Sequence, residues 1–394
     1  MADVHRRDLM KGTAAVAAGV TMSLVATGRA HGGDSSFMNN VPDPLLSGKE
    51  LPTFKFALEK SKGRTSGKNT AKEASVEQLP VSKGIAGVSM GLEPGAMREL
   101  HWHATAAEWA FVDKGRVRTT VVAPGGCTET NDFEAGDVWY FPRGHAHMLE
   151  CLGSEPCHFV LIFDNGYFSE FGTFSISDWI GHTPKPLLAK NFGLPESTFD
   201  SFPQEEVYFA RGALPPQKPA APLAGRKQSP LTHKYRLLAD NPYVDNKGGR
   251  LWLVDSTKFP ISKTMSGAIL DLEAGAMREL HWHPTADEWQ YVMEGQVSVT
   301  LFGANGRYRT EILDKGDVGY IPQGYGHSLE NVGQKSCRVL IGFNSGIYED
   351  IDLSEWMAGN PVNVLATNFN QPAAVFEKFP RKDAFITSKG GPDK

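Results

Sequence analysis

The chain has 394 residues, of which 41% are hydrophobic and 22% charged, and its formal net charge is −5 at pH 7. This length predicts two or three domains, and the composition is that of a globular protein, which excludes an extensively disordered chain. The slightly acidic balance argues against a nucleic-acid-binding surface, which needs clustered Lys and Arg.

The first thirty residues are typical of a twin-arginine export signal. Arg6 and Arg7 precede an uncharged stretch of small residues from Gly12 to Gly28. That stretch is shorter than the roughly 20 residues a membrane-spanning helix needs, so a permanent membrane anchor is the weaker interpretation. We therefore expect residues 1–30 to be a signal peptide, and the mature protein to be periplasmic or extracellular. A cytosolic N-terminus with a chance arginine pair is the alternative.

Residues 51–211 are expected to form a first domain made mainly of strands. Short apolar segments alternate there with Gly, Pro and Asp, a pattern typical of a β-sandwich or barrel: 109–112, 117–122, 138–141 and 158–163. Helical patterning is confined to short stretches after these strands, and Ser177 is the expected N-cap of the first. Cys151 and Cys157 flank a short turn, where a disulfide and two buried thiols both remain open.

Residues 212–230 are expected to be a linker, because prolines cluster there with scattered Gly and Lys. Beyond the linker, residues 231–385 repeat the first domain. At an offset of 180 positions, Glu93–His103 matches Glu273–His283 with one difference. Near the end of each copy the offset falls to 177, so the second copy has lost three residues between positions 346 and 356. The duplication predicts two domains of one fold.

Each copy carries three histidines and one glutamate at the same spacing. Residues two apart on a strand project to the same face, so His101 and His103 point the same way. With Glu108 and His147 they form a set that suits six-coordinate Mn(II) or Fe(II) better than a closed structural zinc site. We expect one metal ion per copy, because the whole set recurs in the second copy: His281, His283, Glu288 and His327.

These residues resemble the two motifs of the cupin superfamily. The first copy reads Gly95-x5-His101-x-His103-x4-Glu108-x6-Gly115 and then Gly136-x5-Pro142-x-Gly144-x2-His147, and the second copy fits as well. Two such copies, each with Arg-Glu-Leu-His-Trp-His, and the segment from Phe168 to Trp179 resemble the bicupin oxalate decarboxylases. The resemblance implies a mainly β fold of two double-stranded β-helix barrels with short peripheral helices.

The resemblance also implies an enzyme that converts oxalate to formate and carbon dioxide with two Mn²⁺ ions per chain and dioxygen as co-catalyst. Oxalate would be its small-molecule partner, and the family's homo-oligomers, trimers or hexamers, are expected. The reaction needs a proton to leave the substrate and another to reach carbon, and Glu170 matches the family's lid glutamate. Arg98 and Arg278 are expected to bind the negative substrate, and Arg98 is expected to be catalytic together with Glu170. Regular alternation places both arginines on the other strand face unless the strand bends.

The lid departs from the family motif Ser-Glu-Asn-Ser-Thr, because Phe171 and Gly172 replace the middle Asn-Ser. This departure leaves lid closure, and the balance between decarboxylation and oxidation, open. In the second copy the ungapped register sets Asp350 opposite Glu170, so a second acidic lid also stays open. Our hypothesis is that the first site decarboxylates and that the second site is structural or an auxiliary redox centre.

Three rival functions compete with decarboxylation. An oxalate oxidase would yield hydrogen peroxide and carbon dioxide, but it has no carbon centre to protonate and no use for Glu170. A storage or metal-holding bicupin needs neither complete ligand sets nor a lid acid. A dioxygenase for a larger substrate would need a wider or more apolar pocket. The ligands themselves do not decide between manganese and iron.

Overall fold

In the computed structural model, residues 45, 48–219 and 225–391 are described. The expected export signal at 1–30 lies outside the described residues and stays a prediction. Among the described residues, we find no helix with the length and apolar character that a membrane crossing requires. The two barrels belong to one compact unit of the chain.

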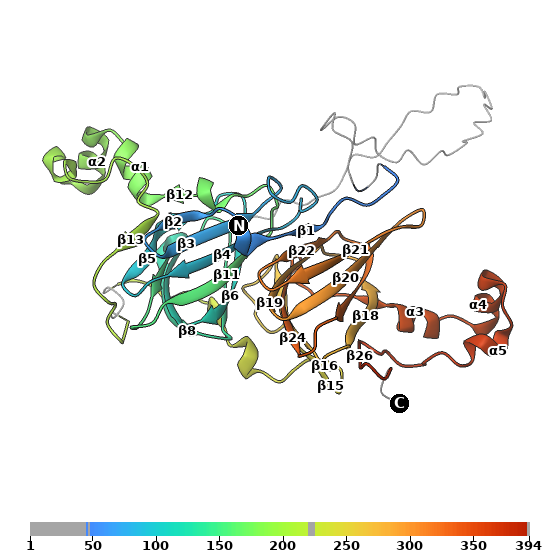
Figure 1. Cartoon of the computed structure of the whole chain (residues 1–394). Coiled ribbons are helices and arrows are strands. Elements are labelled where there is room, and N and C mark those ends of the chain that lie inside the picture. The colour runs from blue at the N-terminus through green and yellow to red at the C-terminus, as the bar shows by residue number, and fades with distance from the viewer. Residues whose placement is uncertain (1–44, 46–47, 220–224, 392–394) are drawn as a thin grey trace, which may run out of the picture. The chain divides into compact units, whose positions relative to one another are not determined.

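The first barrel consists of two antiparallel sheets (Figure 1). One sheet has the strand order β14 (Lys234–Tyr235), β9 (Val138–Phe141), β6 (Glu108–Lys114), β11 (Cys157–Phe163), β4 (Ala86–Leu92), β3 (Asn69–Ala74) and β2 (Arg64–Ser66). The other has the order β12 (Phe174–Ser175), β5 (Ala96–Trp102), β10 (Ala146–Cys151), β7 (Arg116–Ala123) and β8 (Cys127–Glu134), with β13 (Phe209–Arg211) also paired to β5.

The second barrel repeats this arrangement, as the duplication predicts. Its larger sheet has the order β1 (Lys55–Phe56), β22 (Val318–Ile321), β19 (Glu288–Glu294), β24 (Cys337–Phe343), β17 (Ser266–Leu272), β16 (Gly249–Val254) and β15 (Val244–Asn246). Its smaller sheet has the order β21 (Arg307–Asp314), β20 (Gln296–Gly303), β23 (Gly326–Asn331), β18 (Met277–Trp282) and β25 (Ile351–Asp352), with β26 (Ile386–Thr387) also paired to β18. The expected mainly β fold of two barrels is confirmed.

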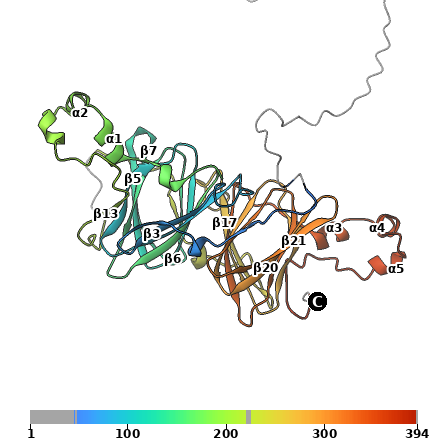
Figure 2. The same ribbon diagram turned by 45° about the horizontal axis from the view of Figure 1, so that its top comes forward.

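A short helical excursion follows each barrel (Figure 2). The first contains α1 (Ile176–His182), α2 (Lys185–Phe192) and the 3₁₀ turn η5 (Glu196–Phe199), and the second contains α3 (Leu353–Ala358), α4 (Val362–Phe369) and α5 (Ala373–Phe376). The described residues also contain the 3₁₀ turns η2 (Leu58–Lys60), η3 (Pro124–Gly126), η4 (Glu170–Gly172) and η6 (Leu237–Ala239). The expected N-cap of α1 is wrong by two residues: Ser175 caps the helix by accepting from Asp178 N, whereas Ser177 donates to Glu99 (2.6 Å).

The barrels exchange short strands in both directions. β1 precedes the first barrel but pairs with β22 of the second, and β14 follows the linker but pairs with β9 of the first. Each exchanged strand has only two residues, which is too short for a hydrophobic pattern to identify. The expected domain bounds, 51–211 and 231–385, remain a prediction. Each of these two segments contributes one short strand to the barrel formed by the other segment.

Two tryptophans at equivalent positions pack against a glycine of the other barrel. A Cβ on Gly87 would lie 2.2 Å from Trp289 Cζ2, and a Cβ on Gly267 would lie 2.5 Å from Trp109 Cζ2. Both indoles are fully buried. Glycine is therefore needed at both positions, because a close-packed interior has no room for a methyl group there.

Cys151 and Cys157 are buried free thiols.

Candidate metal centres

The four predicted ligands of the first barrel come together from three strands. His101 lies on β5, His103 directly follows it, Glu108 begins β6 and His147 lies on β10. All four are buried, and their ligand atoms lie within 4.8 Å of one another. His103 Nε2, Glu108 Oε2 and His147 Nε2 are buried without a hydrogen-bond partner among the described residues. Because buried polar atoms are normally paired, these residues fit a divalent cation.

Backbone carbonyls orient two of these imidazoles. His101 Nδ1 donates to the Glu99 carbonyl (2.6 Å), and His147 Nδ1 donates to the His145 carbonyl (2.8 Å). Each bond leaves Nε2 as the free donor atom for a metal. Burial, reinforced by the charge of Arg98, lowers the pKa of His101 well below its usual value. The imidazole is therefore neutral, as a metal ligand must be.

The outer oxygen of each glutamate ligand accepts a hydrogen bond, but from different residues in the two barrels. Trp139 Nε1 donates to Glu108 Oε1 (2.6 Å), whereas Gln290 Nε2 donates to the corresponding oxygen of the second glutamate (2.6 Å). Trp139 pairs across the strands with Ala110, and Gln290 pairs with Gly319. The large donor side chain has moved to the opposite strand of the pair, and its partner is small in both barrels. Sequence comparison at a fixed offset does not find this exchange.

A β-bulge places Arg98 beside the metal ligands. On β10, His147 and Leu149 are two residues apart, but they pair with His101 and Arg98, which are three apart on β5. The extra residue turns Arg98 to the same face as His101, and Arg98 is fully buried. The bend that the arginine prediction required is therefore present. The second barrel has the same shift, between Arg278 and His281.

An aromatic residue in a left-handed conformation supports each bulge. Tyr208 has φ 59°, its amide donates to Glu99 Oε1 (2.5 Å), and its carbonyl accepts from Glu99 N (3.0 Å). The Arg98 guanidinium carbon lies 3.8 Å from the centre of the Tyr208 ring. Phe385, with φ 46°, stacks in the same way on Arg278 (3.6 Å). Positive φ is rare for aromatic residues, so sequence analysis had no signal for either residue.

Glu170, on η4, reaches the first ligand cluster. Its Oε1 accepts from Arg98 Nε (2.8 Å), its Oε2 lies 3.4 Å from His103 Nε2, and the side chain is fully buried. Burial opposes ionisation, but Arg98 and His103 outweigh it and lower the pKa of Glu170 to about 2. Thr173 Oγ1 accepts from Arg98 Nη2. The structure therefore brings the two residues predicted to be catalytic, Glu170 and Arg98, into direct contact beside the cluster.

The segment 169–173, called the lid below, separates the cluster from a surface pocket. Phe171, Gly172 and Thr173 line that pocket together with Trp102 and Glu206, while none of the four ligands lines it. On the inner side of the same turn, Glu170 contacts His103. The first site is thus enclosed, which does not fit a dioxygenase that admits a large substrate.

The second cluster lacks an acid placed like Glu170, because Glu349, the lid glutamate of the described second barrel, is exposed and accepts from Thr285 Oγ1 (2.8 Å). Strand β12 pairs Ser175 with His101, and β25 pairs Asp352 with His281, so Asp350 corresponds to Thr173 and not to Glu170. Setting Asp350 opposite Glu170 is therefore wrong. The three missing residues fall inside the lid itself, because Tyr348 contacts its histidine as Phe168 does in the first barrel (ring centroids 5.5 and 4.9 Å apart).

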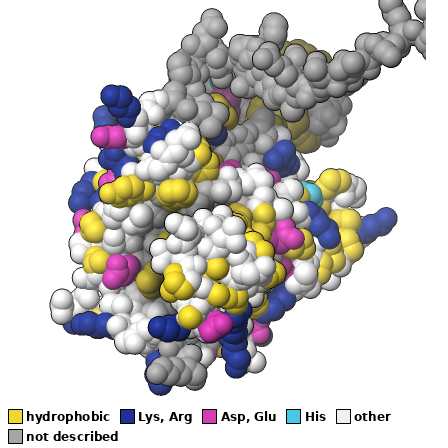
Figure 3. Space-filling view, turned by 90° about the vertical axis from the view of Figure 1, so that its right-hand side faces the viewer, with side chains coloured by type: hydrophobic (Ala, Val, Ile, Leu, Met, Phe, Trp, Pro, Cys, Tyr) yellow, Lys and Arg dark blue, Asp and Glu magenta, His cyan; other side chains and the backbone are white. Residues whose placement is uncertain are grey.

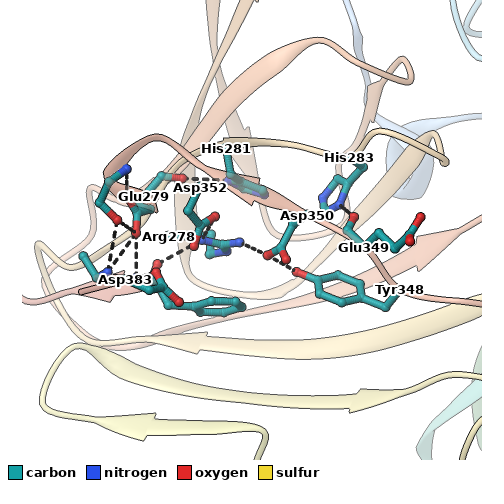
Figure 4. A network of polar contacts seen from close by, with 12 residues as sticks. Arg278, Glu279, His281, His283, Tyr348, Glu349, Asp350, Asp352 and Asp383 are labelled. Atoms are coloured by element: carbon teal, nitrogen blue, oxygen red, sulfur yellow. Dashed lines mark hydrogen bonds and ion pairs between the residues drawn. The ribbon is translucent and has the colours of Figure 1, made fainter. Parts of the chain in front are cut away.

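Two aspartates hold the arginine of the second site (Figure 4). Arg278 Nη1 lies 2.8 Å from Asp352 Oδ1, and Arg278 Nη2 donates to Asp350 Oδ2, which also accepts from Tyr348 Oη (2.7 Å). The ligands themselves form a cluster like the first, with His283 Nε2 2.8 Å from Glu288 Oε2, and His281 and His327 nearby. The chain therefore has two candidate metal sites with different surroundings.

Comparisons with known proteins agree with this architecture. The sequence profile of the cupin family matches residues 57–199 and 235–373. The oxalate decarboxylase of Bacillus subtilis (strain 168) is 40% identical over 312 residues, 79% of this chain and 80% of that protein. A probable oxalate decarboxylase of Arthroderma benhamiae is 35% identical over 348 residues, 88% and 85% of the two chains. A solved structure of the B. subtilis oxalate decarboxylase, concerned with its Mn(II) centres, matches with a TM-score of 0.82 and 36% identity, covering 88% of this chain and 91% of that chain.

Proposed function

Because this chain belongs to the cupin family, and within it to the two-domain oxalate decarboxylases, we propose that it is an enzyme that converts oxalate to formate and carbon dioxide. The observation that carries the proposal is the position of Glu170, a buried carboxylate between Arg98 and the metal ligand His103. An oxalate oxidase, a storage protein or a metal-holding protein has no use for an acid at this position.

The residues of the first site can move the protons that the reaction needs. Glu170 Oε1 is engaged by Arg98, whereas Oε2 has no hydrogen-bond partner and is the atom free to take a proton from bound oxalate monoanion. The ion pair with Arg98 keeps Glu170 a carboxylate at rest. The same oxygen can then return the proton to the carbon that becomes formate. Arg98 supplies the fixed positive charge that holds this small anion.

We propose Mn²⁺ as the ion at both sites, with dioxygen as co-catalyst. His101, His103, Glu108 and His147 would hold the first ion, and the equivalent set in the second barrel would hold the second: His281, His283, Glu288 and His327. Support comes from the Mn(II) centres of the similar B. subtilis enzyme. The bound ion would supply Lewis acidity and a one-electron redox partner.

We assign decarboxylation to the first site and a structural or auxiliary redox role to the second. Arg278 was predicted to bind substrate, but Asp350 forms an ion pair with it and Asp352 Oδ1 lies 2.8 Å from its Nη1. The glutamate of the shortened lid, Glu349, is exposed and does not take the place of Glu170. An oxalate carboxylate would have to displace an aspartate that is fixed next to strand β25. Asp350 therefore opposes substrate binding at the second site.

We also propose a homo-oligomer, a trimer or hexamer, that is exported by the twin-arginine pathway. The helical excursions expose large apolar side chains, such as Trp179 and Phe192 on the first and Trp356 and Phe369 on the second. Figure 3 views the molecule from the side of the second excursion, where hydrophobic side chains lie at the surface among charged ones. Surfaces of this kind are typical of protein interfaces. Light scattering on the purified protein, and replacement of Arg6 and Arg7 by lysine, test the two proposals separately.

The decisive experiment compares the wild type with Glu170→Gln under air and under nitrogen, with formate, carbon dioxide and peroxide measured. We expect formate from the wild type only in the presence of oxygen, and at least a hundredfold less from the variant with unchanged metal content. Glu77→Gln, at an exposed position, is the matched control. Peroxide in place of formate from the wild type would identify an oxidase, and full formate release by Glu170→Gln would disprove the assignment.

A further inference from the structure

A second buried glutamate lies directly beneath the lid. Glu73, on β3, accepts from Ser169 Oγ through both carboxylate oxygens (3.0 Å each) and from the Glu170 amide through Oε2 (3.0 Å). Its side chain does not touch the metal ligands in any of these contacts. Glu73 instead bonds to the lid residue before the catalytic acid and to the backbone of the acid itself.

Ser169 links Glu73 to η4, the turn that contains Glu170. Its hydroxyl oxygen accepts from Phe171 N (3.2 Å) and so caps η4, while its proton is donated to Glu73. One side chain thus both starts the turn and ties it to the barrel. Movement of the lid would break both bonds to Glu73 and leave a carboxylate that is only 8% exposed without these donors.

We propose that Glu73 is a positioning residue that latches the lid in the closed state and thereby holds Glu170 against His103 and Arg98. This inference rests on the proposed function of the first site. A chain of contacts joins strand β3, Ser169, the turn η4 and the Glu170 side chain, and only the last of these four faces the ligands.

The duplication provides an internal comparison. The position equivalent to Glu73 on strand β16 is Leu253, which is buried. The second barrel keeps all four metal ligands and the bulge, but it lacks both an acid placed like Glu170 and the buried carboxylate beneath it. A carboxylate needed for the barrel itself would be expected in both copies. The co-occurrence of Glu73 with the lid therefore favours a role in lid closure.

The test uses the full metal-loaded protein and two variants, Glu73→Gln, which is isosteric, and Glu73→Leu, which copies the second barrel. Hydrogen exchange of the amides of residues 168–174 reports lid opening independently of activity. Loss of a charged hydrogen bond should raise their exchange rate about tenfold to a hundredfold. Glu77→Gln is the control, because it removes an exposed carboxylate four residues further on.

Turnover provides the second measurement. The rate constant kcat for formate should fall by about the same factor in the Glu73 variants, with KM for oxalate nearly unchanged, because Arg98 still binds the substrate. The peroxide share should rise, since the acid that protonates carbon is misplaced. Ser169→Ala should have a similar effect, and the double variant Glu73→Gln/Ser169→Ala should be no worse than either single variant.

The outcomes separate the two proposals. Unchanged exchange of the lid amides and unchanged kcat in both Glu73 variants would overturn the latch, whatever Glu170→Gln does. Additive effects of the Glu73 and Ser169 changes would also overturn it. Suppose instead that Glu170→Gln still produces formate at the wild-type rate, while the Glu73 variants show faster exchange of the lid amides. The role of Glu73 in lid closure is then supported, and the assignment of Glu170 as the catalytic acid is disproved.

Discussion

Replacing Trp139 by phenylalanine should weaken metal binding at the first site alone. The indole Nε1 donates to Glu108 Oε1 at 2.6 Å in a fully buried position, so phenylalanine keeps an aromatic ring there but leaves the outer oxygen of a candidate metal ligand without this donor. A hydrogen bond to a charged group is worth about 1.5–3 kcal/mol, which corresponds to about a tenfold to hundredfold loss of Mn²⁺ affinity. The smaller ring also leaves a void, so the metal-free protein should lose a further ~1–2 kcal/mol of unfolding free energy.

Competitive chelator titration, with the two Mn²⁺ ions resolved by electron paramagnetic resonance, measures the two affinities separately. The matched variant is Gln290→Leu, which removes the corresponding donor from the second site (2.6 Å) and should weaken only that site. A Trp139→Phe protein that binds both ions as tightly as the wild type would show that orientation of Glu108 does not depend on the indole. Equal weakening of both sites by either variant would refute the site-specific argument.

Three further predictions concern stability. Burial opposes ionisation of Glu129, but hydrogen bonds from His233 and Thr232 help to outweigh it, and the pKa of Glu129 is lowered to about 2. Its contribution to stability is therefore complete above about pH 4.5 and is lost as the pH falls toward 2. In urea unfolding, Glu129→Gln should therefore cost about 1–2 kcal/mol at pH 7, with the difference from the wild type shrinking below pH 4.5; a constant difference would contradict this. Gly267→Ala should lower the free energy of unfolding by about 1–3 kcal/mol, and with it the melting temperature, because the new methyl group clashes with Trp109. Gly172→Ala, at an exposed position where a Cβ meets no atom within 4 Å, should be nearly neutral. Chelation of the metal should lower the melting temperature, and Mn²⁺ at a hundred times its Kd should restore about 2.7 kcal/mol per site; calorimetry that shows no shift would argue against occupied sites.

The amino-acid sequence by itself determined that the chain has two similar, mainly β domains, and it identified the residues of both clusters; the choice of barrels over sandwiches came from family resemblance. A strand has a side-chain period of two, so His101 and His103 had to share a face, and the repeat at a constant offset identified Glu108, His147 and their second-copy equivalents. These inferences succeeded because each depends on short-range spacing or on similarity within the chain. The role of Glu170 came from family resemblance, since nothing in its local sequence distinguishes it from a solvated loop carboxylate.

Only the tertiary structure decided which other residues reach the two candidate metal centres. Regular alternation predicts that Arg98 faces away from the ligands. The β-bulge places it on the ligand side, because one extra residue in a strand reverses the face of every residue beyond it. Glu73 meets the lid 96 residues later in the chain, and the exchanged strands β1 and β14 join opposite barrels. Such contacts depend on how distant strands are paired, and a periodic pattern along a single segment carries no information about that pairing.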